Sequence, residues 1–299
     1  MNILITGGSG FLGRQLTPAL LNLGHHVIWI SQNPDKITPL NNIKVIDYNA
    51  LKTLSTPIDV IINLAGAGIA DKRWSDKQKR RFFDSRTNPT LAILDFIKNN
   101  PTSLLISGSA IGYYGVSDNA IFDENSSPIC QDFASELCQT WENLALSATD
   151  ICPTKVAIIR TGVVLDPNGG MMTRLLPAFK MGLGGRLGNG KQVLSFISLS
   201  DWVRAVLFII TKNKSDDLPI RQFYNLTSPN PITNADFTKA IGQLLNKPTL
   251  FHLPSWFLSL LLGEMATLLI DGQKVFPNQL LSMGFEFQDK SIYFLENQL

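Results

Sequence analysis

Six short runs of apolar residues recur along the first 160 positions of the chain, and their near-continuous hydrophobicity predicts strands that are buried on both faces. They lie at residues 2–6, 26–31, 43–47, 59–65, 103–108 and 154–160, and a further short strand at 222–227 is predicted to belong to a smaller lobe. Strands of this kind are typical of parallel sheets, because helices cover both faces of such sheets.

Longer helix-like stretches separate these strands. They span residues 11–24, 75–100, 132–148, 199–213 and 234–246. Gly24 is placed as a glycine just beyond a helix end, and Ser75 as an N-cap. Pro89 predicts a kink or a restart within the second helix. The alternation of strand and helix predicts an α/β fold with a Rossmann-type, doubly wound parallel sheet.

The pattern changes after residue 160, where glycine-rich loops at 166–170 and 182–192 predict a small C-terminal α+β lobe. We expect a dinucleotide-binding domain over residues 1–165, with a sheet that later segments can complete. A substrate-side lobe over 166–250 and a short C-terminal domain over 251–299 should follow. The most apolar stretch, 255–270, is shorter than the ~20 apolar residues of a membrane span, so it predicts a buried helix.

Composition adds little that is specific. Hydrophobic residues make up 44% of the 299 positions and charged residues 17%, as in ordinary globular proteins. A formal charge of +2 indicates neither nucleic-acid nor membrane binding, and the basic run at 77–81 is interpreted as the solvated face of a helix. We therefore expect a small-molecule substrate and a monomer or homodimer.

The cysteines and histidines point to no metal site. The three cysteines form no C-x-x-C pair, and the three histidines are scattered, so neither set has metal-ligand spacing. The chain also starts directly with a strand-like segment. These features predict a protein of the reducing cytoplasm.

The first strand runs into a glycine-rich turn that opens a helix. Gly7, Gly10 and Gly13 have the spacing that permits a tight turn, a close approach to a pyrophosphate and close helix–strand packing. The helix N-terminus supplies free N–H groups for the phosphates. The predicted cofactor contacts here are Gly7, Gly8, Ser9, Gly10, Phe11, Leu12 and Gly13.

The end of the second strand indicates which dinucleotide is bound. An acidic residue there would favour NAD, but this chain has Ser31, Gln32 and Asn33, which favour NADP(H). After the fourth strand, the small residues of the segment 62–68 let its backbone lie along the nicotinamide ribose, and Leu64, Ala65 and Gly66 are the predicted contacts. The alternative for this second segment is a plain turn of small residues.

Several motifs together resemble the extended short-chain dehydrogenase/reductase superfamily. They are "TGGSGFLG" (6–13), "NLAG" (63–66), "SGSAIGYYG" (107–115) and "FISLSDWVRAV" (196–206). The motifs "SRT" (85–87), "WE" (141–142), "RTGVVL" (160–165) and "GLGGRLGNGKQ" (182–192) are similar to an atypical epimerase-like group. That group is sometimes described as nucleoside-diphosphate-sugar epimerases or cell-division inhibitors and ends in a short domain of unassigned function. The resemblance adds Arg86 and Val163 to the expected cofactor contacts.

The resemblance also implies a catalytic set that this chain has only in part. The superfamily uses a Ser or Thr after the fifth strand, which Ser107 or Ser109 can supply, and a Tyr-x-x-x-Lys on the next helix. Here Ala134 and Cys138 stand in the tyrosine and lysine places. The one Y-x-x-x-K, at 48–52, is interpreted as coincidence because it precedes the fourth strand.

Tyr113 and Tyr114 follow the serine strand and could replace the missing tyrosine. A free phenol has a pKa near 10, so a nearby cation would be needed. The candidates for that cation are Arg86, Arg160, Arg186 and Lys191. Alternatively, one tyrosine only packs and the other only contacts the substrate. Cys138 is interpreted as a buried structural cysteine, and Arg186, Lys191 and Ser195 as polar groups on the substrate side.

Two hypotheses of function follow from these residues. The first is an NADP(H)-binding oxidoreductase or epimerase-like enzyme that acts on a small carbonyl, hydroxyl or nucleotide-sugar substrate. The second is a non-enzymatic NADP(H)-sensing or regulatory protein that has kept the cofactor site, which the absent Tyr/Lys pair favours.

Overall fold

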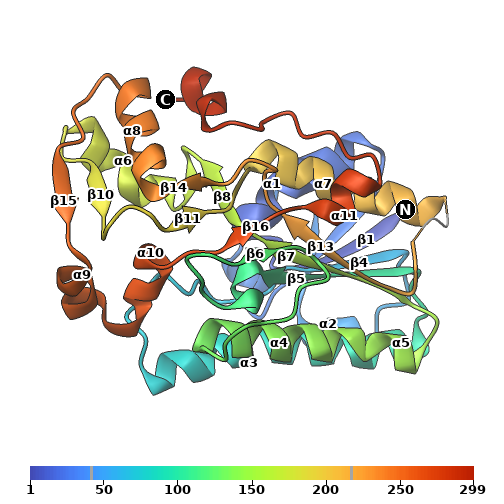
Figure 1. Cartoon of the computed structure of the whole chain (residues 1–299). Coiled ribbons are helices and arrows are strands. Elements are labelled where there is room, and N and C mark those ends of the chain that lie inside the picture. Colours follow the sequence, from blue (N-terminus) through green and yellow to red (C-terminus); the bar gives the residue numbers. More distant parts are fainter. Residues whose placement is uncertain (41–42, 216–217) are drawn as a thin grey trace.

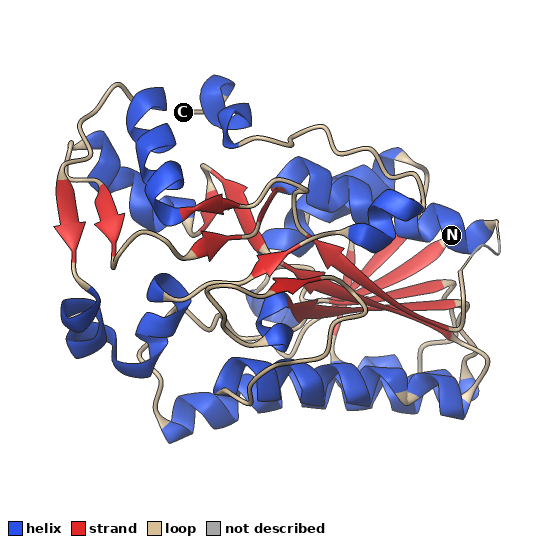
Figure 2. Ribbon diagram, in the orientation of Figure 1, coloured by secondary structure: helices blue, strands red, loops and turns tan. Residues whose placement is uncertain are grey.

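Seven parallel strands form the central sheet of the protein. Figure 2 draws all strands in red, with this sheet in the middle of the molecule. The computed structural model describes residues 1–40, 43–215 and 218–299. In spatial order the strands are β13 (Arg221–Leu226), β7 (Lys155–Thr161), β5 (Leu104–Ala110), β4 (Val60–Asn63), β1 (Asn2–Thr6), β2 (His26–Ile30) and β3 (Lys44–Ile46). The six predicted sheet strands are thereby confirmed, whereas 222–227, predicted for the smaller lobe, instead completes the sheet as β13 beside β7. The strand order reverses between β1 and β4, where ligands bind in such sheets.

Helices cover both faces of this sheet (Figure 1). One face carries α1 (Phe11–Asn22), α7 (Leu199–Lys214) and α11 (Asn278–Ser282). The other carries α2 (Tyr48–Lys52), α3 (Asp76–Asn99), α4 (Phe133–Leu146) and α5 (Ala148–Ile151). Each face has its own cluster of buried aliphatic side chains, which explains why the strands are apolar on both sides.

The predicted roles of Gly24 and Ser75 at helix ends are confirmed, whereas the predicted break inside α3 is not found. Gly24 has a φ of +74° just beyond α1, and Ser75 caps α3 by accepting a hydrogen bond from the Gln78 backbone N–H. The predicted alternative of a restart at Pro89 is wrong, because α3 runs unbroken past it. Pro89 and Thr90 are buried, so packing against the sheet holds the helix across the missing N–H.

A smaller lobe sits beside the sheet, on the left in Figure 1. It contains α6 (Met172–Lys180) and α8 (Asn234–Leu244), which share a third apolar cluster. Its short strands are β8 (Val163–Asp166), β9 (Gly169–Gly170), β10 (Gly185–Leu187), β11 (Val193–Leu194), β12 (Phe196–Ser198), β14 (Ile232–Thr233) and β15 (Phe251–Leu253). The lobe thus contains both helices and short strands, as the glycine-rich loops at 166–170 and 182–192 predict.

The last part of the chain returns from the lobe to the sheet. β16 (Lys274–Val275) pairs with β6 (Ile121–Phe122). Leu280, Phe285 and Phe287 then join the apolar cluster beneath α1 and α7. This segment therefore shares the core of the first domain, whereas Ile292 and Leu295, beyond it, pack into the apolar cluster of the lobe.

The prediction of one buried helix over 255–270 is wrong. The segment forms α9 (Ser255–Leu262), the 3-10 turn η3 (Gly263–Ala266) and α10 (Thr267–Ile270). Gly263, with a φ of +62°, ends α9, and Glu264 turns outward to pair with Lys79. The result leaves Trp256 69% and Leu260 71% exposed at the edge of the lobe.

Within the described ranges no helix combines the length and hydrophobicity needed to cross a bilayer. Nor do three or more His, Cys, Asp or Glu side chains gather there as metal ligands would.

Candidate cofactor and catalytic site

The glycine turn between β1 and α1 has no room for side chains at two of its three spaced glycines. Gly7 has a φ of +70°, and a Cβ there would lie 2.6 Å from the Leu64 carbonyl oxygen. A Cβ on Gly13 would lie 2.6 Å from the Gly7 carbonyl oxygen. Gly10 differs, since only the Gly7 oxygen, at 3.1 Å, lies within 4 Å of its Cβ position. The turn is therefore tightly packed at Gly7 and Gly13 and open at Gly10.

The N-terminus of α1 is free to bind an anion. Gly10 is the N-cap, no side chain caps the helix, and its first turn has no acidic residue. The first N–H groups of a helix have no partners within it, and the helix dipole favours negative charge there. The phenyl ring of Phe11, at the first helical position, lies against Gly169 at the start of β9. This geometry fits the pyrophosphate of a dinucleotide.

A cavity of about 930 Å³ extends from this turn across the carboxyl ends of β1, β2 and β4. It brings together predicted contacts from three separate segments, namely Gly7, Ser9, Ser31, Gln32, Asn33, Ala65 and Gly66. Tyr48 also lines it, at the start of α2, which places the Y-x-x-x-K sequence at the β2 side of the cavity. Gly8 instead packs under the indole ring of Trp29.

One face of α3 closes the cavity with polar side chains. Lys77, Arg80, Arg81, Asp84 and Asn88 line it at helical spacing. The interpretation of the 77–81 run as a merely solvated face is therefore incomplete, since three of its cations face the cavity. Lys79 points elsewhere, and its Nζ lies 2.6 Å from a carboxylate oxygen of Glu264.

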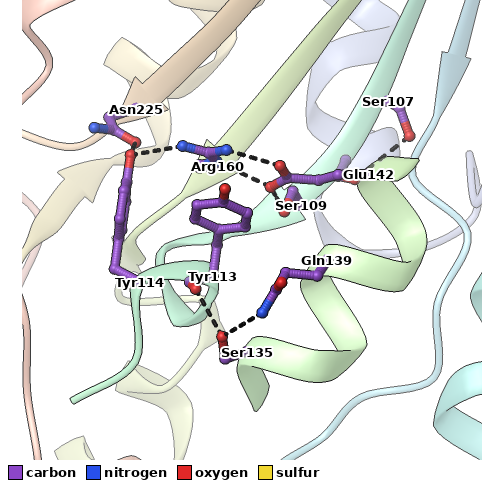
Figure 3. Close-up of polar contacts among 10 residues, drawn as sticks. Ser107, Ser109, Tyr113, Tyr114, Ser135, Gln139, Glu142, Arg160 and Asn225 are labelled. Carbon is purple, nitrogen blue, oxygen red and sulfur yellow. Dashed lines mark hydrogen bonds and ion pairs between the residues drawn. The ribbon is translucent and has the colours of Figure 1, made fainter. Parts of the chain in front are cut away.

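A second, buried polar cluster joins α4 to the carboxyl ends of β5 and β7 (Figure 3). Arg160 donates from Nε and Nη2 to the two carboxylate oxygens of Glu142, at 2.9 and 2.8 Å. Ser109 donates to the same carboxylate at 2.6 Å. Burial disfavours the charge on Arg160, but the hydrogen bonds and charge of Glu142 outweigh it and raise the arginine pKa. Arg160 is therefore a fixed cation with a fixed counter-charge.

Arg160 contacts both tyrosines of the short 3-10 turn η2 (Ile111–Tyr114). The Tyr114 hydroxyl donates to the Asn225 side-chain oxygen at 2.7 Å and accepts from Arg160 at 3.0 Å. Tyr114 is fully buried, and burial raises its pKa to about 12. Tyr113 is half-buried, and its ring centroid lies 3.5 Å from the guanidinium carbon of Arg160. Within the described residues, its hydroxyl has no hydrogen-bond partner.

The face of α4 that should carry the tyrosine and lysine carries other residues. Ala134, Cys138 and Glu142 follow one another at intervals of four. Ala134 packs beside Gly112 of η2, and burial raises the pKa of the Cys138 thiol to about 11. Ser135 donates to the Tyr113 carbonyl oxygen at 2.8 Å, which ties α4 to η2. The small residues on α4 thus leave room for η2 to lie against the helix.

The remaining predicted cofactor and substrate contacts are more scattered. Arg86 donates to the Phe82 and Ala67 carbonyl oxygens, lies over the Trp141 ring at 5.3 Å, and has its pKa lowered by burial. Val163 begins β8, and Ser107 is fully buried with its hydroxyl 3.4 Å from the Gly108 oxygen. The prediction that Ser195 reaches toward a substrate is wrong, because it is buried and bonded to the Gln273 carbonyl.

Two members of the buried cluster are absent from the predicted site. Glu142 belongs to the "WE" motif but has no predicted role in the site, and no sequence pattern singles out Asn225. The spacing of four residues from Cys138 to Glu142 is the one signal that places Glu142 on the catalytic face. Asn225 is separated from Tyr114 by 111 residues, so no local pattern connects them.

Comparison with known proteins identifies relatives along the whole chain. A model described as "NAD dependent epimerase/dehydratase family" matches residues 3–226, and a domain of unknown function, DUF1731, matches 253–293. The "Epimerase family protein Mb2239" of Mycobacterium bovis is 38% identical over 299 residues, which cover 97% of this chain and 94% of the relative. A chloroplastic "Epimerase family protein SDR39U1 homolog" of Arabidopsis thaliana is 35% identical and covers 98% of this chain and 84% of its own.

Solved structures extend the comparison. The crystal structure of human epimerase family protein SDR39U1 with NADPH matches with a TM-score of 0.88 and 29% identity, over 100% of this chain and 98% of that one. A UDP-glucose 4-epimerase of Thermotoga maritima, solved with UDP-glucose, matches with a TM-score of 0.77 at 18% identity, covering 96% and 94%. At that identity the second likeness shows the fold alone. Both comparisons agree with the Rossmann-type sheet.

Proposed function

The chain belongs to the NAD-dependent epimerase/dehydratase family, and from that premise we propose that it is an NADP(H)-dependent oxidoreductase or epimerase-like enzyme. Its substrate would carry a carbonyl or hydroxyl group, on a small molecule or a nucleotide sugar. Tyr113 would be the acid–base residue. The observation that carries this assignment is the unpartnered Tyr113 hydroxyl beside the buried Arg160.

The residues around the glycine turn fit NADP(H). Gly7 and Gly13 form a cradle that a Cβ would fill, and the α1 N-terminus offers free N–H groups to the pyrophosphate. The segment after β2 contributes Gln32 and Asn33 and no carboxylate that would repel a 2′-phosphate. The NADPH bound to human SDR39U1 supports the same choice of cofactor. When bound, the nicotinamide supplies or accepts a hydride.

The two tyrosines differ in what their hydroxyls can do. The Tyr114 proton is held by Asn225, and its oxygen accepts from Arg160, so this hydroxyl is structurally committed. Within the part of the chain that the structure describes, the Tyr113 hydroxyl has no such bonds, and its side chain is half-exposed. Tyr113 can therefore donate a proton to a carbonyl oxygen during reduction and, as the phenolate, take one from a hydroxyl during oxidation.

The buried ion pair serves to hold Tyr113 in place. Glu142 binds the guanidinium of Arg160 at two points, which fixes its plane against the Tyr113 ring. Ser109 gives its own proton to Glu142, so its oxygen can accept a hydrogen bond only from another hydroxyl of the substrate, next to the reacting one. In this arrangement Tyr113 moves the proton, and Ser109 holds the neighbouring hydroxyl.

The test combines cofactor binding with turnover. The purified protein should bind NADPH and oxidise it with at least one member of a panel of small carbonyl compounds and nucleotide sugars. Tyr113→Phe should keep NADPH binding and reduce turnover by about 10²–10⁴-fold, the range of general acid–base catalysis. Stopped-flow absorbance at the reduced-nicotinamide band measures both quantities.

Ser135→Ala is the matched control, because it removes the bond to the Tyr113 backbone but leaves the phenol in place. It should alter turnover far less than Tyr113→Phe. Full turnover in Tyr113→Phe would refute the acid–base assignment. Tight NADPH binding with no turnover on any substrate of the panel would instead support a non-enzymatic NADP(H) sensor.

A further inference from the structure

We propose that Lys77, Arg80 and Arg81 of α3 bind the 2′-phosphate of NADP(H) and so set the preference for it over NAD(H). The inference rests on the proposed cofactor and adds to it the residues that discriminate. The 2′ position of the adenosine ribose is usually recognised by the segment after the second strand, which ends here at Asn33. The three cations lie 44 or more positions further along the chain, on α3.

The three cations face the cofactor cavity as a group. Positions 77, 80, 81, 84 and 88 follow the spacing of one helix face, and all five line the cavity. The same cavity is lined by Ser31, Gln32 and Asn33 after β2. The helix face and the β2 end thus border one space, and the adenosine half of the cofactor is expected there.

The charge in this space suits a phosphate. Asp84 is the single acidic residue among those that line the cavity, against three cations. Within the described part of the chain, none of the three has a carboxylate within 4.0 Å, whereas their neighbour Lys79 is paired with Glu264. A phosphomonoester carries about −1.5 to −2 charge at neutral pH, so it matches the excess positive charge.

The segment after β2 cannot supply this charge by itself. Its side chains are neutral, and the Ser31 hydroxyl is already used to accept a bond from the Asn33 backbone at 3.1 Å. Neutral donors can bond to either a 2′-hydroxyl or a 2′-phosphate and therefore discriminate weakly between them. Charged donors form the stronger, charge-assisted bonds that only the phosphate offers.

The experiment measures NADPH and NADH dissociation constants separately for the full-length protein by fluorescence titration at low and high salt. The variants are Lys77→Gln and the double variant Arg80→Gln/Arg81→Gln. The double variant should bind NADPH at least roughly tenfold more weakly, while NADH binding stays unchanged. The salt dependence of NADPH binding should also decrease.

Lys98→Gln/Lys239→Gln is the matched control, since it removes two exposed cations that do not line the cavity. It should leave both dissociation constants unchanged, and circular dichroism confirms that every variant is folded. Equal weakening of NADPH and NADH, or no weakening of either, in the double variant would overturn the assignment. A wild-type protein that binds neither dinucleotide would refute the proposed function itself.

Discussion

At the scale of single residues, two glycines of the turn have different roles, since Gly13 allows close packing and Gly10 leaves the helix N-terminus open for a ligand. Gly13 has no space for a methyl group, because backbone atoms of Gly7 and Gly8 lie within 2.6 Å of its Cβ position. Gly10 is exposed, and only one atom lies within 4 Å of its Cβ position, at 3.1 Å. Alanine should therefore have different effects at the two positions.

We predict that Gly10→Ala folds normally but loses dinucleotide binding, because the methyl group occupies the open side of the helix N-terminus where the pyrophosphate should approach. Gly13→Ala should lower the free energy of unfolding by about 1–3 kcal/mol, the cost of overpacking, and also weaken binding. Urea denaturation and NADPH titration measure the two effects. Wild-type NADPH affinity in Gly10→Ala would contradict the predicted approach.

The tyrosines show how far a single residue can be assigned from the sequence. Position after the serine strand is enough to place Tyr113 and Tyr114 at the carboxyl edge of the sheet. It cannot separate them, because the difference depends on a hydrogen bond from Tyr114 to Asn225, 111 residues away. Of the four candidate cations, Arg160 is the one that lies against Tyr113, and this too depends on tertiary pairing.

At the scale of elements, α4 and β7 together hold a buried ion pair on the helix face where the superfamily pattern places Tyr and Lys. The sequence correctly predicts the helix, and the resemblance identifies the face that holds Ala134 and Cys138. Neither predicts that Glu142 on that face pairs with Arg160 from β7. Both side chains are about 2% exposed, so the pair joins helix and sheet in the interior.

Glu142→Gln is predicted to destabilise the protein by about 3–5 kcal/mol, because it leaves the Arg160 charge buried without a counter-charge. It should also reduce turnover, since the guanidinium would no longer be held at two points against Tyr113. Urea denaturation gives the free energy of unfolding, and turnover under folding conditions gives the second effect.

Asp95→Asn is the matched control for that substitution. It removes a carboxylate from the exposed Asp95–Lys98 pair on α3, whose side chains are 65% and 54% exposed. Such surface pairs contribute about 0–1 kcal/mol, so little change is expected. If Glu142→Gln unfolds no more easily than Asp95→Asn, the buried pair has no structural role of the proposed kind.

At the scale of the whole molecule, a segment near the end of the chain shares a core with the first strand. Leu280, Phe285 and Phe287 pack in the same apolar cluster as Ile3 and Trp202. Sequence patterns predict the sheet well, since parallel strands are apolar over short local windows. They failed at 255–270, because whether an apolar helix is covered depends on the neighbours that the whole fold provides.

This shared core leads to a prediction about unfolding. The sheet and the C-terminal segment should unfold in one cooperative transition, and NADPH should shift that transition as a unit. At a free concentration of 100 times its dissociation constant, a ligand stabilises the folded state by about 2.7 kcal/mol. Hydrogen exchange by mass spectrometry should therefore show slower exchange by the same factor in β1 and in α11. Gly10→Ala should abolish both changes, because it removes binding and not packing. Protection of β1 alone, with α11 exchanging as before, would show that the C-terminal segment unfolds separately from the cofactor domain.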